Sequence, residues 1–145
     1  MEVIFERLRT EHLDEILKIE QESFLSPWTR GMFEREMNMP VSRFFSAVHD
    51  GRVIGYGGYW LIHNEAHILN IAVTARERRK GVGRLVLTKL LNDMKERKVI
   101  KSFLEVRKRN IAARNMYVSL GFVENGIREQ YYTDDDAILM EKEIE

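Results

Sequence analysis

Short apolar runs bounded by turn residues predict the strands of this chain. Residues 44–48 and 53–60 are rich in aromatic and β-branched side chains, and they flank Asp50-Gly51, a dipeptide that favours a two-residue hairpin turn. Further strands are expected at residues 3–8, 66–73, 101–107, 122–123 and 137–144, the last two as a closing antiparallel pair around an acidic turn.

Apolar residues at helical spacing predict helices between these strands. Thr10 is a candidate N-cap for a first helix, and a short second helix is expected after Thr29. A third helix is expected from about Gly83, with one apolar face. Asn110 is placed to cap a fourth helix, which Gly121 would end. The order β-α-α-β-β-β-α-β-α-β-β predicts an α/β fold in which helices pack on a mixed sheet.

Composition narrows the class of protein. The length of 145 residues, without linkers or repeats, favours a single domain over residues 1–145. There is no cysteine, which excludes a disulfide framework and a thiol nucleophile and fits a cytoplasmic location. Lys+Arg and Asp+Glu both number 23, so the basic excess of a nucleic-acid-binding protein is absent.

No targeting, membrane or metal signal is expected either. The longest uncharged stretch, residues 53–64, has 12 residues, whereas a membrane span needs roughly 18 or more apolar residues. The start Met-Glu-Val does not resemble a signal peptide. His63 and His67 are predicted on a turn and a strand rather than on one helix face, so no metal is expected there.

Residues 78–84, with the sequence RRKGVGR, carry the most specific chemistry of the chain. Two glycines two residues apart allow a tight turn and close approach of the backbone to a ligand, so a side chain at Gly81 is expected to weaken binding. The following helix directs free N–H groups at the loop, and the basic residues add positive charge, which together suit a pyrophosphate. The pattern is neither a Walker loop nor a Rossmann fingerprint. A charged loop whose glycines merely turn the chain is the alternative.

The loop resembles motif A of the GNAT acetyltransferases, R/Q-x-x-G-x-G/A, through Arg78, Gly81 and Gly83. Further blocks resemble the RimI-like branch, the ribosomal-protein-alanine N-acetyltransferases: Ser23-Phe24 with Pro27-Trp28, HILNIAV at 67–73, LEVRxxN at 104–110, and Tyr131-Tyr132 followed by DAxxM at 136–140. The resemblance covers nearly the whole chain. It implies the GNAT fold, a central mixed sheet flanked by about four helices.

The resemblance also implies a site for acetyl-CoA where the strands ending at Val73 and Arg107 separate. The cofactor-binding residues implied are the backbone of Ile71, Ala72 and Val73, the loop residues Arg78, Arg79, Lys80, Gly81, Val82, Gly83 and Arg84, and the amide of Asn110. A backbone N–H near Val73 would polarise the thioester carbonyl. No metal is implied.

Glu105 and Tyr117 are the candidate catalytic base and acid. Glu105 lies in an apolar strand, where a carboxylate is disfavoured unless it has a use; an ion pair with Arg107 or a helix lysine is the alternative. Tyr117 follows Asn110 by seven residues, two helical turns, so both face the same ligand. Its alternative role is packing in the core.

The acceptor site is expected near Trp28, Tyr131 and Tyr132. Trp28 either packs in the core or walls the acceptor groove, and one of the two adjacent tyrosines can point inward. The acidic residues 134–136 either form a polar hairpin tip or attract a cationic N-terminus. The turn after Tyr132 is shorter than in typical members of the branch, which affects the wall of the acceptor site.

The resemblance implies transfer of an acetyl group from acetyl-CoA to the N-terminal α-amino group of a protein, specifically the N-terminal alanine of a small-subunit ribosomal protein. Two other functions remain open at this point. One is acetylation of a small amine, such as a polyamine or aminoglycoside. The other is a non-catalytic acyl-CoA-binding sensor, which would need neither Glu105 nor Tyr117.

Overall fold

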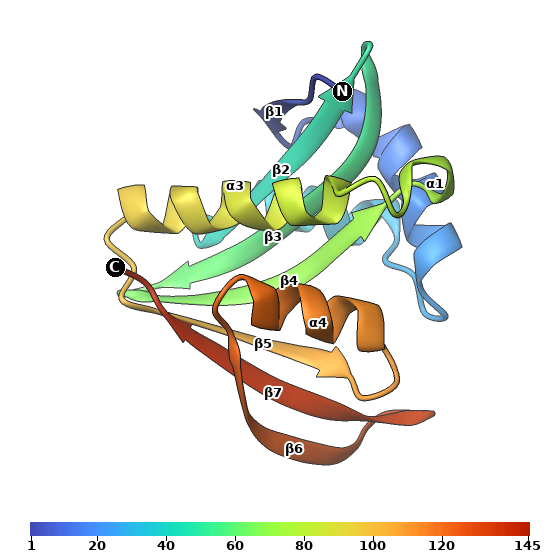
Figure 1. Ribbon diagram of the computed structural model, residues 1–145. Helices are drawn as coiled ribbons and strands as arrows, with labels where there is room; N and C mark the ends of the chain where they lie inside the picture. The colour runs from blue at the N-terminus through green and yellow to red at the C-terminus, as the bar shows by residue number, and fades with distance from the viewer.

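A computed structural model describes residues 1–145, and Figure 1 shows its arrangement. Seven strands form one mixed sheet in the order β1-β2-β3-β4-β5-β7-β6. The strands are β1 (Ile4–Arg7), β2 (Ser42–His49), β3 (Arg52–Ile62), β4 (Glu65–Val73), β5 (Lys101–Arg107), β6 (Val123–Tyr132) and β7 (Asp135–Glu143). The helices are α1 (Leu13–Ser23), α2 (Arg30–Met37), α3 (Val82–Glu96) and α4 (Ile111–Ser119). The predicted order and fold class are confirmed.

The local turn and cap signals are confirmed at four of five positions, the Asn110 cap of α4 among them. Asp50 and Gly51 have φ of 50° and 74° and join β2 to β3. The Thr29 side chain accepts the Met32 N–H at the start of α2, and Gly121 follows α4 with φ of 101°. The expectation for Thr10 is wrong, because residues 10–12 form a 3₁₀ turn and α1 starts one residue later.

Helices cover both faces of the sheet (Figure 1). One core lies beneath α3 and α4 and includes Leu87, Leu90 and Tyr117. A second core lies beneath α1 and α2, where Ile16 and Phe33 pack on the opposite face. None of the helices has both the length and the apolar character needed to cross a membrane.

The sheet opens between β4 and β5. These parallel strands pair only at their first residues, ending with His67 opposite Phe103. A bulge in β4, where Gly58 faces Asn70 but Tyr59 faces Ile68, bends the strand at this point. Beyond it the strands diverge in Figure 1, and α4 lies beside the opening. The β4 edge that faces the opening therefore has no strand partner there.

The last two strands form a longer hairpin than expected. β6 runs over ten residues, although only residues 122–123 carry a strand signal in the sequence. Nearly all of β6 is exposed at the sheet edge, so its residues do not alternate between polar and apolar. The pattern that predicts a half-buried strand is therefore missing.

Candidate functional site

A pocket of about 400 Å³ lies at the open end of β4. Its walls come from the end of β4, the loop that follows, the first turn of α3 and one side of α4. The lining residues are Ile71, Ala72, Val73, Glu77, Arg78, Arg79, Gly81, Val82, Gly83, Arg84, Ala112, Ala113 and Met116. The structure therefore gathers the predicted cofactor-binding residues around one pocket, except for Lys80 and Asn110.

The backbone of the loop suits an anion. Gly81 is the N-cap of α3 with φ of 83°, and the first helical bond at its carbonyl comes from Leu85 N–H at 3.1 Å. The N–H groups of the first helical turn are therefore free, at the positive end of the helix dipole. A Cβ built on Gly81 meets nothing within 4 Å, so a ligand can approach the backbone closely. The residues fit a pyrophosphate.

Gly81 and Gly83 are required for different reasons. Gly81 needs a left-handed backbone, which strains any residue with a side chain. A Cβ on Gly83 would lie 3.5 Å from Met116 Sδ and 3.7 Å from a Val73 methyl group, two walls of the pocket. A side chain at Gly83 would therefore enter the pocket, whereas one at Gly81 would occupy the open space beside the loop and would also strain the backbone.

Most basic side chains of the loop already have partners within the chain. Arg78 Nε donates to the Val73 carbonyl oxygen at 3.1 Å, and Arg78 Nη2 donates to Ser23 Oγ at 3.0 Å. Separately, Lys80 pairs with Glu77 at 3.3 Å, and Arg84 donates to Ser119 Oγ at 2.6 Å. Only Arg79 has neither an ion pair nor a side-chain hydrogen bond, so it is the cation most available to a ligand.

Glu105 has no ion-pair partner. The neighbouring Leu104 and Val106 lie in the core, so strand alternation directs the half-buried Glu105 to the other face. Neither expected alternative, a pair with Arg107 or with a helix lysine, is formed, and Arg107 binds Asp134 instead. The carboxylate is therefore free for a proton-transfer role.

Tyr117 is largely buried, with 8% of its surface exposed, and its ring packs edge-on against Phe122 at 5.7 Å. No group of the chain hydrogen-bonds its hydroxyl, and the hydroxyl oxygen is not among the fully buried unpartnered atoms. Burial, followed by the nearby Tyr132, raises the pKa of Tyr117. The hydroxyl therefore keeps its proton at neutral pH and reaches accessible space.

Asn110 caps α4 with its side-chain oxygen, which accepts the Ala113 N–H at 3.2 Å. The amide nitrogen of Asn110 remains free to donate a hydrogen bond.

Among the predicted acceptor residues, the half-buried Trp28 packs against Phe33 and Phe44, with ring centroids 5.1 and 5.9 Å apart. Its ring therefore belongs at least in part to the core beneath α2.

Tyr131 and Tyr132 differ in environment. Tyr131 is 47% exposed, whereas Tyr132 is half-buried beneath the Arg107 guanidinium, 4.2 Å from its ring centroid. Burial raises the pKa of Tyr132, and the charge of Glu105 adds to this effect. Tyr132 thus lies against Arg107, which is two residues from Glu105 on the same face of β5, and Tyr132 in turn adds to the effect of burial in raising the pKa of Tyr117.

Glu20 in α1 is a buried carboxylate that is not predicted from the sequence. Glu20 is 1% exposed and accepts hydrogen bonds from the Trp28 backbone at 2.7 Å, from Asn70 Nδ2 at 3.3 Å and from the Tyr56 hydroxyl. It joins the segment before α2 to the bulge in β4. A signal was present, because position 20 continues the apolar stripe of α1 that includes Ile16.

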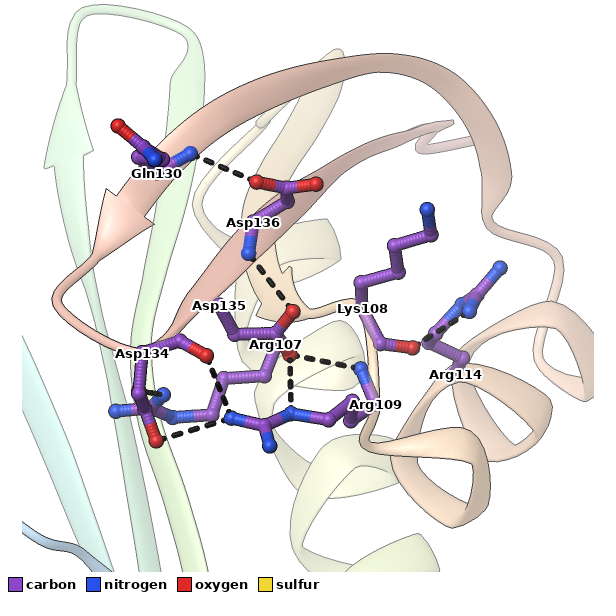
Figure 2. Close-up of polar contacts among 8 residues, drawn as sticks. All are labelled: Arg107, Lys108, Arg109, Arg114, Gln130, Asp134, Asp135 and Asp136. Carbon is purple, nitrogen blue, oxygen red and sulfur yellow. Dashed lines mark hydrogen bonds and ion pairs between the residues drawn. The ribbon is translucent and has the colours of Figure 1, made fainter.

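The acidic turn after β6 is paired with arginines (Figure 2). Asp134 binds both Arg107 and Arg109, and Asp135 binds Arg109 at 3.3 Å. The arginines neutralise the negative charge of these carboxylates, so the carboxylates are poorly suited to attract a cationic acceptor.

No three His, Asp or Glu side chains are arranged to hold a metal ion.

Residues 13–122 match the sequence profile of the acetyltransferase (GNAT) family. Ribosomal protein bS18-alanine N-acetyltransferase of Escherichia coli strain K12 is 36% identical over 142 residues, covering 92% of each chain. The protein of the same name from Salmonella typhimurium is 34% identical, with the same coverage. The crystal structure of ribosomal-protein-S18-alanine N-acetyltransferase from Escherichia coli has a TM-score of 0.91 and 33% identity, covering 99% of this chain and 94% of that one.

Proposed function

This chain belongs to the GNAT family of acetyltransferases, and from that premise we propose that it transfers an acetyl group from acetyl-CoA to the α-amino group of an N-terminal alanine. The proposed acceptor is ribosomal protein bS18, the protein in the names of the relatives from Escherichia coli and Salmonella typhimurium. Such an acceptor implies a cytoplasmic location. We further propose that residues 1–145 form one catalytic domain, since all seven strands belong to one sheet.

The observation that carries the proposal is the pair of groups around Tyr132. Glu105 offers a carboxylate without an ion-pair partner, and Tyr117 offers a protonated hydroxyl. Glu105 shares one face of β5 with Arg107, whose guanidinium lies over the Tyr132 ring, and Tyr132 in turn adds to the effect of burial in raising the pKa of Tyr117, so we place both groups at one end of the opening between β4 and β5. A non-catalytic sensor would need neither group, which favours an enzyme.

We propose that the loop and the edge of β4 hold acetyl-CoA. The free N–H groups of the first turn of α3 and the Arg79 side chain would bind the pyrophosphate, with Lys80 and Arg84 adding positive charge. The edge of β4 at Ile71 to Val73 that faces the opening, and that has no strand partner on the β5 side, would bind the pantetheine, together with the Asn110 amide. Bound acetyl-CoA supplies an acetyl thioester that an amine can attack.

The chain's own groups would move two protons. Glu105 would accept the proton that the acceptor amine loses, directly or through a water molecule, and Tyr117 would donate a proton to the departing sulfur. An N-terminal amine is roughly 10% neutral at pH 7, whereas a lysine is well below 1% neutral. A single carboxylate is therefore better matched to an N-terminal amine.

The experiment is acetylation of a short peptide with the N-terminal sequence of bS18. The purified protein is incubated with acetyl-CoA and the peptide, and tandem mass spectrometry locates the acetyl group. We expect modification of the α-amine only. A peptide with the same lysines but a blocked N-terminus is the matched control, and spermidine tests the small-amine alternative. Turnover of spermidine or lysine alone would contradict the proposed acceptor.

A further inference from the structure

The end of β5 and the residues that follow it are joined to the β6–β7 hairpin by a group of charged side chains (Figure 2). We call Arg107, Arg109, Asp134 and Asp135 the latch. Arg107 binds the Asp134 carboxylate, while Arg109 Nη2 donates to the Asp134 carbonyl oxygen at 2.7 Å and to its carboxylate at 3.0 Å. Asp135 accepts the Arg109 backbone N–H at 2.9 Å. Each side of the latch therefore contributes two residues.

The backbone ladder alone does not fix the hairpin tip. Arg128 pairs with Ala137 and Tyr132 pairs with Asp135, so three residues of β6 lie opposite one residue of β7. Within this irregular stretch Gln130 has φ of 52°, and its N–H bonds the Asp136 side chain at 2.8 Å. Side-chain contacts therefore replace strand pairing where the hairpin approaches the site.

Arg107 connects the latch to the site. Its guanidinium lies 4.2 Å from the centroid of the Tyr132 ring while it binds Asp134. A guanidinium over an aromatic face attracts the ring, and a carboxylate that fixes the guanidinium also fixes the ring. Asp134 thus acts on Tyr132 through Arg107.

We propose that Arg107 and Asp134 are positioning residues that hold Tyr132 at the acceptor end of the opening and so set acceptor selectivity. The proposal rests on the proposed function, because Tyr132 matters only where an acceptor binds. Only Thr133 and Asp134 separate β6 from β7, so the latch lies directly at this short turn.

The latch can position side chains near the site, but it contributes little to the free energy of unfolding. The side chains of Arg107 and Asp134 are 31% and 40% exposed, and that of Arg109 is 65% exposed. Ion pairs this open to solvent contribute little to folding. Loss of the latch should therefore change acceptor use while the unfolding temperature stays nearly constant.

The test is steady-state kinetics of Asp134→Asn, Arg107→Ala and the double variant with Ala- and Leu-initiated peptides. We expect kcat/KM for the Ala peptide to fall by about tenfold to a hundredfold, and its ratio to that for the Leu peptide to fall as well. The double variant should be no worse than the poorer single variant, because both act on Tyr132. Arg107→Lys should recover only part of the loss, since Lys keeps the charge but not the planar group.

The matched control is Glu141→Gln, which breaks the 3.3 Å pair with Lys101 at the other end of β5 and β7. We expect it to behave as wild type, and we expect every variant to keep the acetyl-CoA affinity of wild type. Latch variants that match this control, or losses that add fully in the double variant, would overturn the positioning role. If wild type acetylates only small amines, the proposed function fails instead, and the latch is then compared on that acceptor.

Discussion

Arg78 Nε donates to the carbonyl oxygen of Val73, 3.1 Å away, so the motif arginine holds the end of β4 with its own side chain. The same guanidinium reaches Ser23 at the end of α1. Arg78 therefore joins three elements around the pocket, whereas its neighbour Arg79 has no such contact. The two arginines should differ in what they do.

For this reason we expect Arg78→Ala and Arg79→Ala to have opposite signatures. Arg78→Ala should lower the free energy of unfolding by about 1 kcal/mol, because it removes two exposed hydrogen bonds. Arg79→Ala should leave stability unchanged and weaken CoA binding several-fold. Urea denaturation and calorimetric titration with CoA separate the two effects. Equal losses of CoA affinity would show that Arg78 also contacts the ligand.

The glycines of the loop provide a second pair of variants. Gly83→Val should lower CoA affinity by at least tenfold with little loss of stability, because its side chain would enter the pocket beside Met116. Gly81→Ala should destabilise the protein by about 1–2 kcal/mol, since φ at this position is 83°. Binding and thermal unfolding are measured for both. Unchanged CoA binding in Gly83→Val would mean that the ligand lies elsewhere.

Tyr117→Phe should lower kcat by about 10²–10⁴-fold with CoA affinity unchanged, because only the proton-donating hydroxyl is lost. Burial raises the pKa of Tyr117 above its ordinary value, so the group stays protonated as the pH rises. We therefore expect wild-type kcat to show no fall between about pH 7 and pH 9.5 from ionisation of this residue. A loss of CoA affinity in Tyr117→Phe would indicate a binding role instead.

Glu105→Gln keeps the shape of the side chain and removes the base. We expect kcat/KM for the peptide to fall by about a hundredfold at pH 7. The difference in kcat/KM between the variant and wild type should become smaller toward higher pH, where more of the acceptor amine is already neutral. A pH–rate profile tests this. A deficit below about tenfold at every pH would leave positioning and the contact near Val73 as the main sources of catalysis.

Glu20 should make stability depend on pH. Burial raises the pKa of its carboxyl group, although hydrogen bonds from Trp28, Tyr56 and Asn70 oppose this effect. A group with a raised pKa in the folded state binds more protons when folded, so its contribution is present below the unfolded pKa and is lost as pH rises through the folded pKa.

The free energy of unfolding of wild type relative to Glu20→Gln should therefore fall between about pH 4 and pH 7. Urea denaturation across this range measures it, with the exposed Glu34→Gln as the control. A constant difference would show that the hydrogen bonds to the carboxylate balance its burial.

Local features of the sequence determine much of this protein. The Asp50-Gly51 turn, the Thr29 and Asn110 caps and the glycine loop before α3 depend on residues that are close together in the chain. For such features the side chain and the backbone it acts on lie within a few residues of each other, so their chemistry can be predicted directly. The order of elements follows from these features together with the apolar periodicity, and the family follows from the resemblance of the motif blocks.

Only the tertiary structure decides which candidate side chains are free to act. Arg78 donates a hydrogen bond to Ser23, 55 residues away. Arg107 binds Asp134, 27 residues further along the chain, and not Glu105. The burial of Glu20 likewise depends on Asn70, 50 residues distant. Partners this far apart are chosen by how the sheet and helices pack, because charge and hydrogen-bonding capacity alone allow many pairings. The sequence thus determines the fold and the loop, and packing determines the chemistry left available at the site.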